Sequence, residues 1–259
     1  MRLIFIRHGD PDYEHDTLTE KGIREAICLS DYIRNLNIDV AYKSPLGRAQ
    51  KTAEYALKKL DITAQTLDWL REFPAEFDPN ISADASNAFR TELSKKDDNT
   101  YNKRIIWDAL PSYYGMHPEL FERDGWKKSD IVKCSNMLEV YENVEKSFLK
   151  LLAEYGYVKN GDVFKAENNN DKTIAFFCHF GITSVLMSVL WNISPFVPLQ
   201  YMAMAPTSVT EIVTEEREKK IAVFRALRIG DITHLNIAGE KPSFSARFCE
   251  RFENEDERH

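Results

Sequence analysis

Residues 2–9 read R-L-I-F-I-R-H-G, in which four consecutive apolar residues end directly at Arg7 and His8. Such a continuous apolar run is typical of a strand that is covered on both faces, as in a parallel sheet. A second run, I-A-F-F-C at residues 174–178, ends at His179. Ligands bind at the carboxyl ends of the strands in open α/β sheets, so we expect His8 and His179 to lie close together.

The remainder of the chain alternates between strand and helix patterns. Thr19 is the expected N-cap of the first helix, and Ser44-Pro45 the expected N-cap and first helical residue of the second. The alternation predicts an α/β fold with three layers, α/β/α, around a mostly parallel central sheet. We predict further strands at residues 38–42, 62–68, 157–158, 163–164, 209–214 and 221–227, and helices at residues 19–36, 44–60, 135–155 and 181–191.

Residues 73–134 differ from this pattern. They are rich in Asp, Asn, Ser and aromatic residues, and their hydrophobic periodicity is weak. We therefore predict a single α/β domain over residues 1–259, with residues 73–134 inserted as a cap segment.

Composition excludes several classes of protein. A formal net charge of −7 disfavours non-specific nucleic-acid binding, which depends on basic surface. Residues 173–210 contain no Asp, Glu, Lys or Arg, but His179 and three prolines there favour a strand, a turn and a buried helix over a membrane span. The four cysteines show no C-x-x-C spacing, and only four apolar residues precede Arg7, too few for a signal peptide. These features predict a cytoplasmic protein without a membrane partner.

Besides Arg7, a second arginine is expected to lie close to the two histidines. Arg48 falls in the first turn of the helix expected to start at Ser44, where free amides and the helix dipole favour an anion. Two arginines and two histidines around one point suit a dianion such as phosphate, because guanidinium donors match phosphate oxygens. Nearby cations should lower the pKa of His8 and keep it neutral and nucleophilic. Gly9 permits close approach of the backbone.

Several segments resemble one known family in order along the chain. Arg7-His8-Gly9 resembles the R-H-G signature of the histidine phosphatase superfamily, which includes the cofactor-dependent phosphoglycerate mutases. Residues 18–26, L-T-E-K-G-I-R-E-A, are similar to its L-T-x-x-G-x-x-Q-A, and residues 44–53 to its S-x-x-x-R-A-x-x-T-A. Residues 178–183 resemble its second-histidine motif, and residues 206–212 and 230–235 resemble later core elements.

The resemblance implies a role for each matched residue. His8 would attack phosphorus and form a phosphohistidine intermediate, while Arg7, Gly9, Arg48 and His179 would bind the phosphate. A carboxylic acid would protonate the leaving group, and Glu72 fits the family's position for it better than Glu76. No metal and no cofactor is implied, and the partner is a small phosphorylated substrate.

The expected activity is metal-independent hydrolysis of a phosphate monoester. After R-H-G this chain has D-P-D-Y-E-H instead of the E-x-x-x-N type of the mutase-like members, which favours a hydrolase over a mutase. Three alternatives remain at this level: a phosphoglycerate-mutase-type phosphotransferase, a metallohydrolase and a catalytically silent phospholigand-binding protein. The metal reading rests on His8, Asp10, Asp12 and His15, an H-x-D-x-D-x-x-H pattern. A homodimer is expected by analogy alone.

Overall fold

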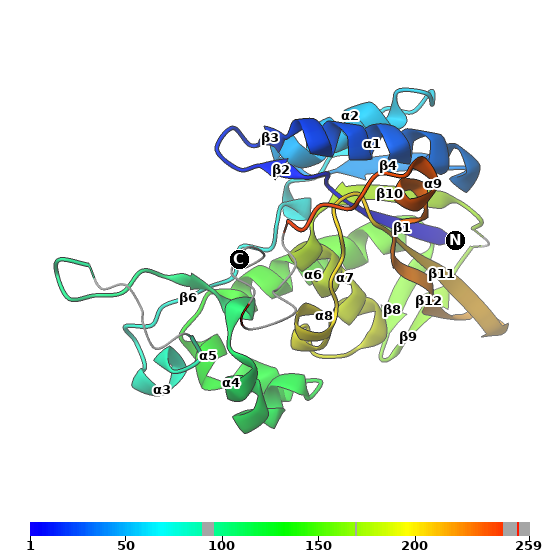
Figure 1. The fold of residues 1–259 in the computed structure, drawn as a ribbon. Helices are drawn as coiled ribbons and strands as arrows, with labels where there is room; N and C mark the ends of the chain where they lie inside the picture. Colours follow the sequence, from blue (N-terminus) through cyan, green and yellow to red (C-terminus); the bar gives the residue numbers. More distant parts are fainter. Residues whose placement is uncertain (90–95, 169, 246–252, 254–259) are drawn as a thin grey trace. The chain divides into compact units, whose positions relative to one another are not determined.

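The computed structural model describes residues 1–89, 96–168, 170–245 and 253 (Figure 1). The chain divides into two compact units. The first comprises Met1–Glu72, Leu151–Thr183 and Ala203–His259, and the second comprises Phe73–Lys150 and Ser184–Met202. Cys249 and most of the acidic tail lie outside the described residues. The role of residues 73–134 as a cap stays a prediction.

An eight-stranded sheet forms the centre of the first unit. Four strands in the order β5 (Gln65–Thr66), β4 (Val40–Lys43), β10 (Thr173–Cys178) and β1 (Arg2–Arg7) are parallel. The sheet continues through the antiparallel pairs of β11 (Val209–Glu218), β12 (Ile221–Asp231), β9 (Val163–Ala166) and β8 (Tyr157–Asn160). Within this sheet β11 and β9 run against β1 and the other strands run with it, which confirms the predicted α/β fold with a mostly parallel sheet.

The register of β1 and β10 brings their carboxyl ends level. Phe5 pairs with Phe176 and Arg7 with Cys178, and the sheet continues one residue further because the His8 N–H donates to the Cys178 carbonyl at 3.0 Å. Residues Leu3 to Ile6 are buried on both faces, as their continuous apolar character predicts. His8 and His179 consequently emerge side by side at one edge of the sheet.

Two helices cover one face of this sheet (Figure 1). Helix α1 (Glu20–Ile33) begins at the predicted cap, where the Thr19 hydroxyl accepts from the Gly22 N–H at 3.0 Å, and a 3-10 turn (Arg34–Leu36) follows it. Helix α2 spans Gly47–Leu57. The core between sheet and helices contains Ile4, Ile6, Leu29, Ile33, Ala53, Ala56, Leu57, Ala175 and Phe177.

The predicted start of α2 at Ser44-Pro45 was wrong. The helix begins at Gly47, and its N-cap residue, Leu46, makes no side-chain cap hydrogen bond. The Ser44 hydroxyl is instead within hydrogen-bonding distance of His179 Nε2, at 2.8 Å, and accepts from the Leu46 N–H at 3.2 Å. A residue far along the chain thus uses the hydroxyl that the local pattern assigned to the helix.

The charge-free stretch forms separate short elements, as predicted. Strand β10 is followed by α7 (Phe180–Trp191), which starts in the first unit, and by α8 (Phe196–Tyr201) in the second. In the part of the chain that the structure describes, no helix is long and apolar enough to cross a bilayer.

The second unit contains short elements and one long helix, α6 (Met137–Glu154), which continues into the first unit. Trp126 is buried and packs edge-on against Tyr141 and Phe196, with ring centroids 5.0 and 6.3 Å away. The unit also has β6 (Glu76–Phe77) paired with β7 (Arg104–Ile105), helices α3 (Ala83–Ser86), α4 (Pro111–Met116) and α5 (Asp130–Lys133), and 3-10 turns at Ile106–Asp108, Pro118–Phe121 and Gly125–Lys128.

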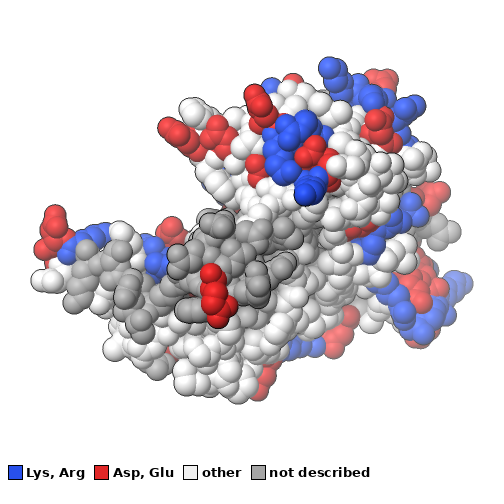
Figure 2. Space-filling model, viewed as in Figure 1, with Lys and Arg blue, Asp and Glu red and all other residues white. Residues whose placement is uncertain are grey.

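The remaining elements belong to the first unit. They are the small sheet of β2 (Pro11–Asp12) and β3 (Thr17–Leu18), the 3-10 turn Asp68–Leu70 and helix α9 (Thr233–Ala238). Figure 2 shows Lys and Arg side chains interspersed with Asp and Glu on one face of the molecule. Among the described residues on that face, neither sign forms a continuous patch. The lack of a nucleic-acid partner stays a prediction from the net charge.

Candidate active site

His8 is held rigidly at the end of β1. Its backbone N–H donates to Cys178, and its carbonyl accepts from the Thr207 N–H at 3.1 Å. Its ring Nδ1 lies 2.7 Å from the Gly9 carbonyl oxygen. A carbonyl can only accept, so Nδ1 carries the proton and Nε2 carries the lone pair. The ring therefore has one defined tautomer and one defined nucleophilic atom.

The surroundings of His8 favour its neutral form. The side chain is 2% exposed, and burial is the largest cause that lowers its pKa well below the usual 6.5; the charges of Arg7 and Arg48 lower it further. The sequence predicted this direction from the cations alone, whereas desolvation dominates in the folded protein. A neutral imidazole at neutral pH keeps the Nε2 lone pair available for attack.

His179 lies against His8, with ring centroids 5.0 Å apart. It is fully buried, and burial followed by the proximity of His8 lowers its pKa well below 6.5. The Ser44 hydroxyl can donate to His179 Nε2 while it accepts from the Leu46 N–H, and we assign this arrangement, which places the imidazole proton on Nδ1. That Nδ1 is buried and has no hydrogen-bond partner among the described residues, so it is a donor suited to an anion.

Arg7 contributes a buried cation to the same cluster. Its side chain is 3% exposed, and one terminal nitrogen donates to the Met204 carbonyl. Its Nε is buried without a partner in the described residues. Burial is the largest cause that lowers the pKa of Arg7, while Tyr13 and the carboxylates of Glu72 and Glu25 raise it. Such a group retains its charge and offers free donors to phosphate oxygens.

Arg48 is the second residue of α2 and is fixed by Asp16. Its Nη1 lies 2.7 Å from Asp16 Oδ1, and the other carboxylate oxygen accepts from the Gly47 N–H, also at 2.7 Å. The Arg48 side chain is 12% exposed and its Nε is buried without a partner in the described part of the chain. The positive charge of Arg48 also lowers the pKa of both His8 and His179, so Arg48 acts electrostatically on the two histidines.

Gly9 makes the close approach that the sequence predicted, but to another part of the chain. A Cβ at this position would lie 2.7 Å from the Gly22 carbonyl oxygen, in α1. The Gly9 N–H donates to the Thr52 hydroxyl at 3.0 Å. Gly9 thus lets α1 pack on the loop after β1, and its role in phosphate binding stays a prediction.

The two candidate acids are in different surroundings. Glu72 Oε1 accepts from the Ile182 N–H, in the first turn of α7, at 3.1 Å, and its charge acts on Arg7. Glu72 therefore belongs to the cluster of the two histidines, within the first unit. Glu76 is exposed on β6 of the second unit, where its backbone N–H donates to Asn136.

The residues of the metal-binding pattern do not form one group. Asp12 and His15 pair with each other at 2.8 Å in an exposed loop. Asp10 points elsewhere, accepting from Thr19 and Ser243. Among the described residues, no three His, Cys, Asp or Glu side chains are placed to hold a metal ion.

Sequence reasoning missed several polar residues that support the site. Asp16 and Ser44 hold Arg48 and His179, respectively, and His234 is buried with its Nε2 2.9 Å from the Thr207 hydroxyl, behind the His8 backbone. Glu25 is fully buried on α1. A signal for Glu25 was present, since it shares the apolar helix face of Ala26 and Leu29.

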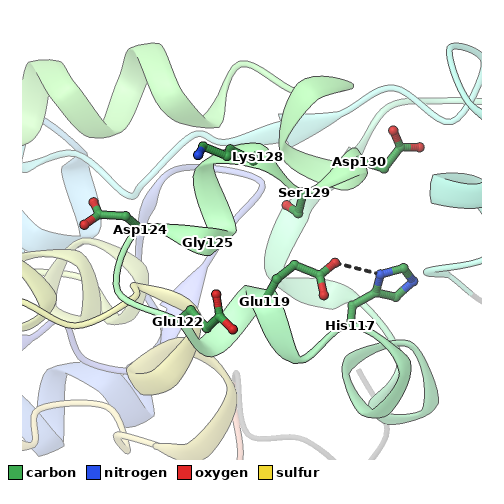
Figure 3. Close-up of a pocket in the computed structure, with 8 residues that line it drawn as sticks. All are labelled: His117, Glu119, Glu122, Asp124, Gly125, Lys128, Ser129 and Asp130. Atoms are coloured by element: carbon green, nitrogen blue, oxygen red, sulfur yellow. Dashed lines mark hydrogen bonds and ion pairs between the residues drawn. The ribbon is translucent and has the colours of Figure 1, made fainter.

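A depression of about 460 Å³ lies in the second unit (Figure 3). His117 in its lining bonds to Glu119 at 2.9 Å, and Lys128 is its basic residue. Carboxylates outnumber this lysine and disfavour a phosphorylated ligand there. The acidic residues of the lining are Glu119, Glu122, Asp124 and Asp130.

Comparison with a protein-family model supports the predicted class for the N-terminal part of the chain. Residues 3–105 match the model of the histidine phosphatase superfamily (branch 1), the segment that contains His8, Arg48 and Glu72. Over these residues the match supports the histidine phosphatase superfamily, the family that the Arg7-His8-Gly9 motif predicted.

Curated relatives match a short part of the chain. The 2,3-bisphosphoglycerate-dependent phosphoglycerate mutase of Bartonella quintana is 38% identical over 69 residues, and that of Bartonella bacilliformis is 36% identical over 69 residues. Each alignment covers 22% of this chain and 34% of the relative. The match thus spans about a third of the length of these mutases.

Solved structures show the same fold over most of the chain. A mutant of the phosphoserine phosphatase from Entamoeba histolytica, in complex with phosphoserine, aligns with a TM-score of 0.57 at 17% identity, covering 90% of this chain and 98% of that one. A mycobacterial glucosyl-3-phosphoglycerate phosphatase aligns with a TM-score of 0.54 at 16% identity, with the same coverage. The alpha-ribazole phosphatase of Shigella flexneri gives 0.51 at 18% identity, covering 89% of this chain and 97% of that one.

Proposed function

We propose that this protein hydrolyses a phosphate monoester without a metal, through a phosphohistidine at His8. The observation that carries the proposal is the hydrogen bond from His8 Nδ1 to the Gly9 carbonyl, which leaves the lone pair on Nε2. That neutral nucleophile lies within a group of buried donors from Arg7, Arg48 and His179. Phosphoryl transfer needs this combination of a nucleophile and fixed positive charge.

The reaction has two displacements. In the first, His8 Nε2 attacks phosphorus, the bond to the ester oxygen breaks, and the leaving alkoxide takes a proton from Glu72. In the second, ionised Glu72 takes a proton from water, which attacks phosphorus and breaks the bond to Nε2. Inorganic phosphate, the alcohol and the original protonation states result. Arg7, Arg48 and the His179 Nδ1–H stabilise the phosphoryl oxygens in both steps.

Small phosphate monoesters are the proposed substrate class. The names of the proteins with similar folds, phosphoserine phosphatase and glucosyl-3-phosphoglycerate phosphatase among them, support this class. A cytoplasmic location and a homodimer belong to the same proposal, the latter by analogy with proteins of this architecture.

A mutase is the second candidate, because the curated relatives matched at the N-terminal segment are phosphoglycerate mutases. This activity would need a phosphorylated cofactor to prime His8. It would isomerise a phosphoglycerate and release little phosphate.

The test measures nitrophenol release from p-nitrophenyl phosphate in excess EDTA, for the wild type and for His8→Ala. Turnover that persists in EDTA and is lost in His8→Ala supports the proposal. Acid-labile radioactive phosphate that is transferred from a labelled substrate to His8 identifies the intermediate. Turnover that only a metal restores would overturn it. Isomerisation of phosphoglycerate without phosphate release would establish the mutase instead.

A further inference from the structure

The peptide group between Gly9 and Asp10 links His8 to a buried carboxylate. Its carbonyl oxygen accepts from His8 Nδ1 at 2.7 Å. Its N–H, from Asp10, donates to Glu25 Oε2 at 2.9 Å. The peptide bond is trans, so the carbonyl and the N–H point in opposite directions. One planar, polarisable group therefore lies between the His8 ring and Glu25.

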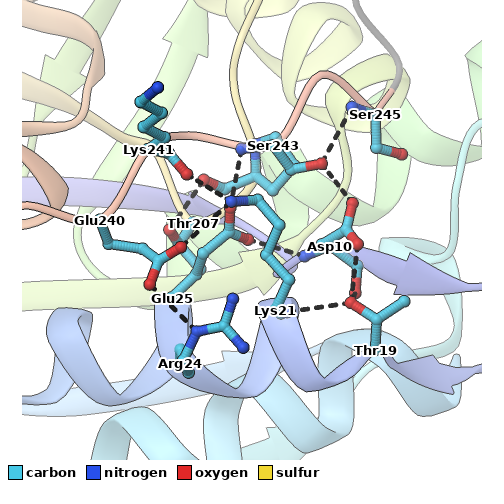
Figure 4. Close-up of polar contacts among 12 residues, drawn as sticks. Asp10, Thr19, Lys21, Arg24, Glu25, Thr207, Glu240, Lys241, Ser243 and Ser245 are labelled. Atoms are coloured by element: carbon cyan, nitrogen blue, oxygen red, sulfur yellow. Dashed lines mark hydrogen bonds and ion pairs between the residues drawn. The ribbon is translucent and has the colours of Figure 1, made fainter.

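Glu25 is held in place from both sides. It lies on α1 and is fully buried, and its second oxygen, Oε1, accepts from the Ser243 N–H at 2.9 Å. Figure 4 shows its side chain directed from α1 toward Asp10 and Ser243. Both oxygens face N–H donors, an arrangement that only the ionised carboxylate satisfies in full.

We propose that Glu25 is a positioning residue for His8, acting through the Gly9–Asp10 peptide group. The carboxylate polarises this peptide and makes the Gly9 carbonyl a stronger acceptor, which secures the proton on His8 Nδ1. Positive charge develops on the imidazole as Nε2 bonds to phosphorus, and the aligned chain of dipoles ending in a carboxylate stabilises it. The catalytic part of this inference rests on the proposed function, whereas the effect on the tautomer does not.

The charge on Glu25 depends on pH in the neutral range. Burial raises its pKa to about 7, although the hydrogen bonds from Ser243 and Asp10 lower it. The charged groups that face it are Asp10 on the loop after β1, Lys21 and Arg24 on α1, and Arg7 on β1. The pKa of His8 is well below 6.5, so His8 does not titrate at the same pH.

The C-terminal segment that contains Ser243 also contains Glu240, which offers a matched control. Glu240 pairs with Lys21 and Arg24, at 3.1 Å each, and so ties this segment to α1 without touching the Gly9–Asp10 peptide (Figure 4). Glu240→Gln makes the same chemical change as Glu25→Gln. It weakens the attachment of the segment and leaves the link to His8 intact.

The experiment records ring 15N shifts of His8 by NMR, together with kcat and KM against pH, for the wild type, Glu25→Gln and Glu240→Gln. We expect Glu25→Gln to lower kcat about tenfold near pH 8, with KM nearly unchanged. In the wild type kcat should fall as the pH drops through about 7, and this fall should be absent in Glu25→Gln. Its His8 ring should show a detectable Nε2–H tautomer. Glu240→Gln should match the wild type in all three readouts.

The inference would be overturned if Glu25→Gln had the same kcat, the same pH dependence of kcat and the same His8 15N shifts as the wild type. If Glu25→Gln does not fold, the wild type alone decides: the Asp10 amide proton and the His8 Nδ1 proton should shift together with a midpoint near pH 7. Independent midpoints would contradict the link. If the wild type lacks phosphatase activity, the proposed function fails, and the tautomer still tests this inference separately.

Discussion

Arg48 Nη1 and Asp16 Oδ1 lie 2.7 Å apart, and the same Asp16 carboxylate accepts from the Gly47 N–H that starts α2. One side chain therefore supplies the helix cap that sequence patterns assigned to Ser44, and it also orients Arg48, which we propose binds phosphate. Asp16 is itself in the left-handed region, at φ 46°, which an aspartate adopts more readily than most residues. The loop between β2 and β3 thus determines where the guanidinium points.

Replacing Asp16 should affect both binding and stability. We expect Asp16→Ala to raise KM for p-nitrophenyl phosphate several-fold, since Arg48 loses its anchor, and to lower the free energy of unfolding by about 1 kcal/mol through loss of the cap. Steady-state kinetics and urea denaturation measure the two effects. A variant with unchanged KM would show that Arg48 is positioned by other contacts.

Glu72→Gln should remove the proposed general acid. For an alkyl phosphate we expect kcat/KM, which reports the first displacement, to fall about 100-fold or more, because the poor leaving group needs a proton. For p-nitrophenyl phosphate the loss in kcat/KM should be smaller, since nitrophenolate leaves unprotonated. Glu76→Gln is the matched control and should retain wild-type rates with both substrates; a reversed result would assign the acid to Glu76.

Ser44→Ala removes the hydroxyl that contacts His179 Nε2. The imidazole would then lose its preferred tautomer, and we expect kcat/KM to fall about tenfold. Ser30→Ala is a suitable control, because the buried Ser30 hydroxyl has no partner among the described residues. Equal kinetics for the two variants would contradict a role of Ser44 in orienting His179.

The raised pKa of Glu25 should appear in the pH dependence of stability. Its pKa rises from 4.5 to about 7 on folding, so the native state binds the proton more tightly. The resulting stabilisation is complete below pH 4.5 and is lost as the pH rises through 7, amounting to at most about 3 kcal/mol. Urea denaturation across this range should show the decline in the wild type, and Glu25→Gln should show a flatter profile.

Gly9→Ala should destabilise the protein by about 2 kcal/mol, because the added Cβ would lie 2.7 Å from the Gly22 carbonyl oxygen. Gly115→Ala in α4 has open space around the new methyl group and should be neutral or stabilising by up to about 1 kcal/mol. Thermal unfolding of both variants gives the comparison. Similar melting temperatures would mean that the loop after β1 can move away from α1.

The sequence predicts the centre of this molecule well, because β1 and β10 are apolar runs whose ends carry histidines. Parallel strands have their carboxyl ends at one edge, so the proximity of His8 and His179 follows from topology alone. Thr19 was likewise predictable as a cap, since its partner, Gly22, lies three residues away.

The supporting contacts were not predictable in this way. Ser44 bonds to His179 across 135 residues, and Glu25 to Ser243 across 218. Local patterns assign such polar residues to the nearest helix end or to solvent, whereas the folded chain assigns them to distant donors. The reach of these contacts, and not weak local signals, limited the prediction of the site.

The position of β1 in the sheet has a consequence for biosynthesis. This strand is translated before both of its hydrogen-bonding partners, β10 and β11, and the Met1 amino group bonds to Asn170 and Thr214, 169 and 213 residues away. The apolar strand β1 therefore remains unpaired during translation until β10 and β11 have been synthesised. During that interval its unpaired edges are open to aggregation, and binding of a chaperone to residues 2–7 would protect the same segment that later presents His8.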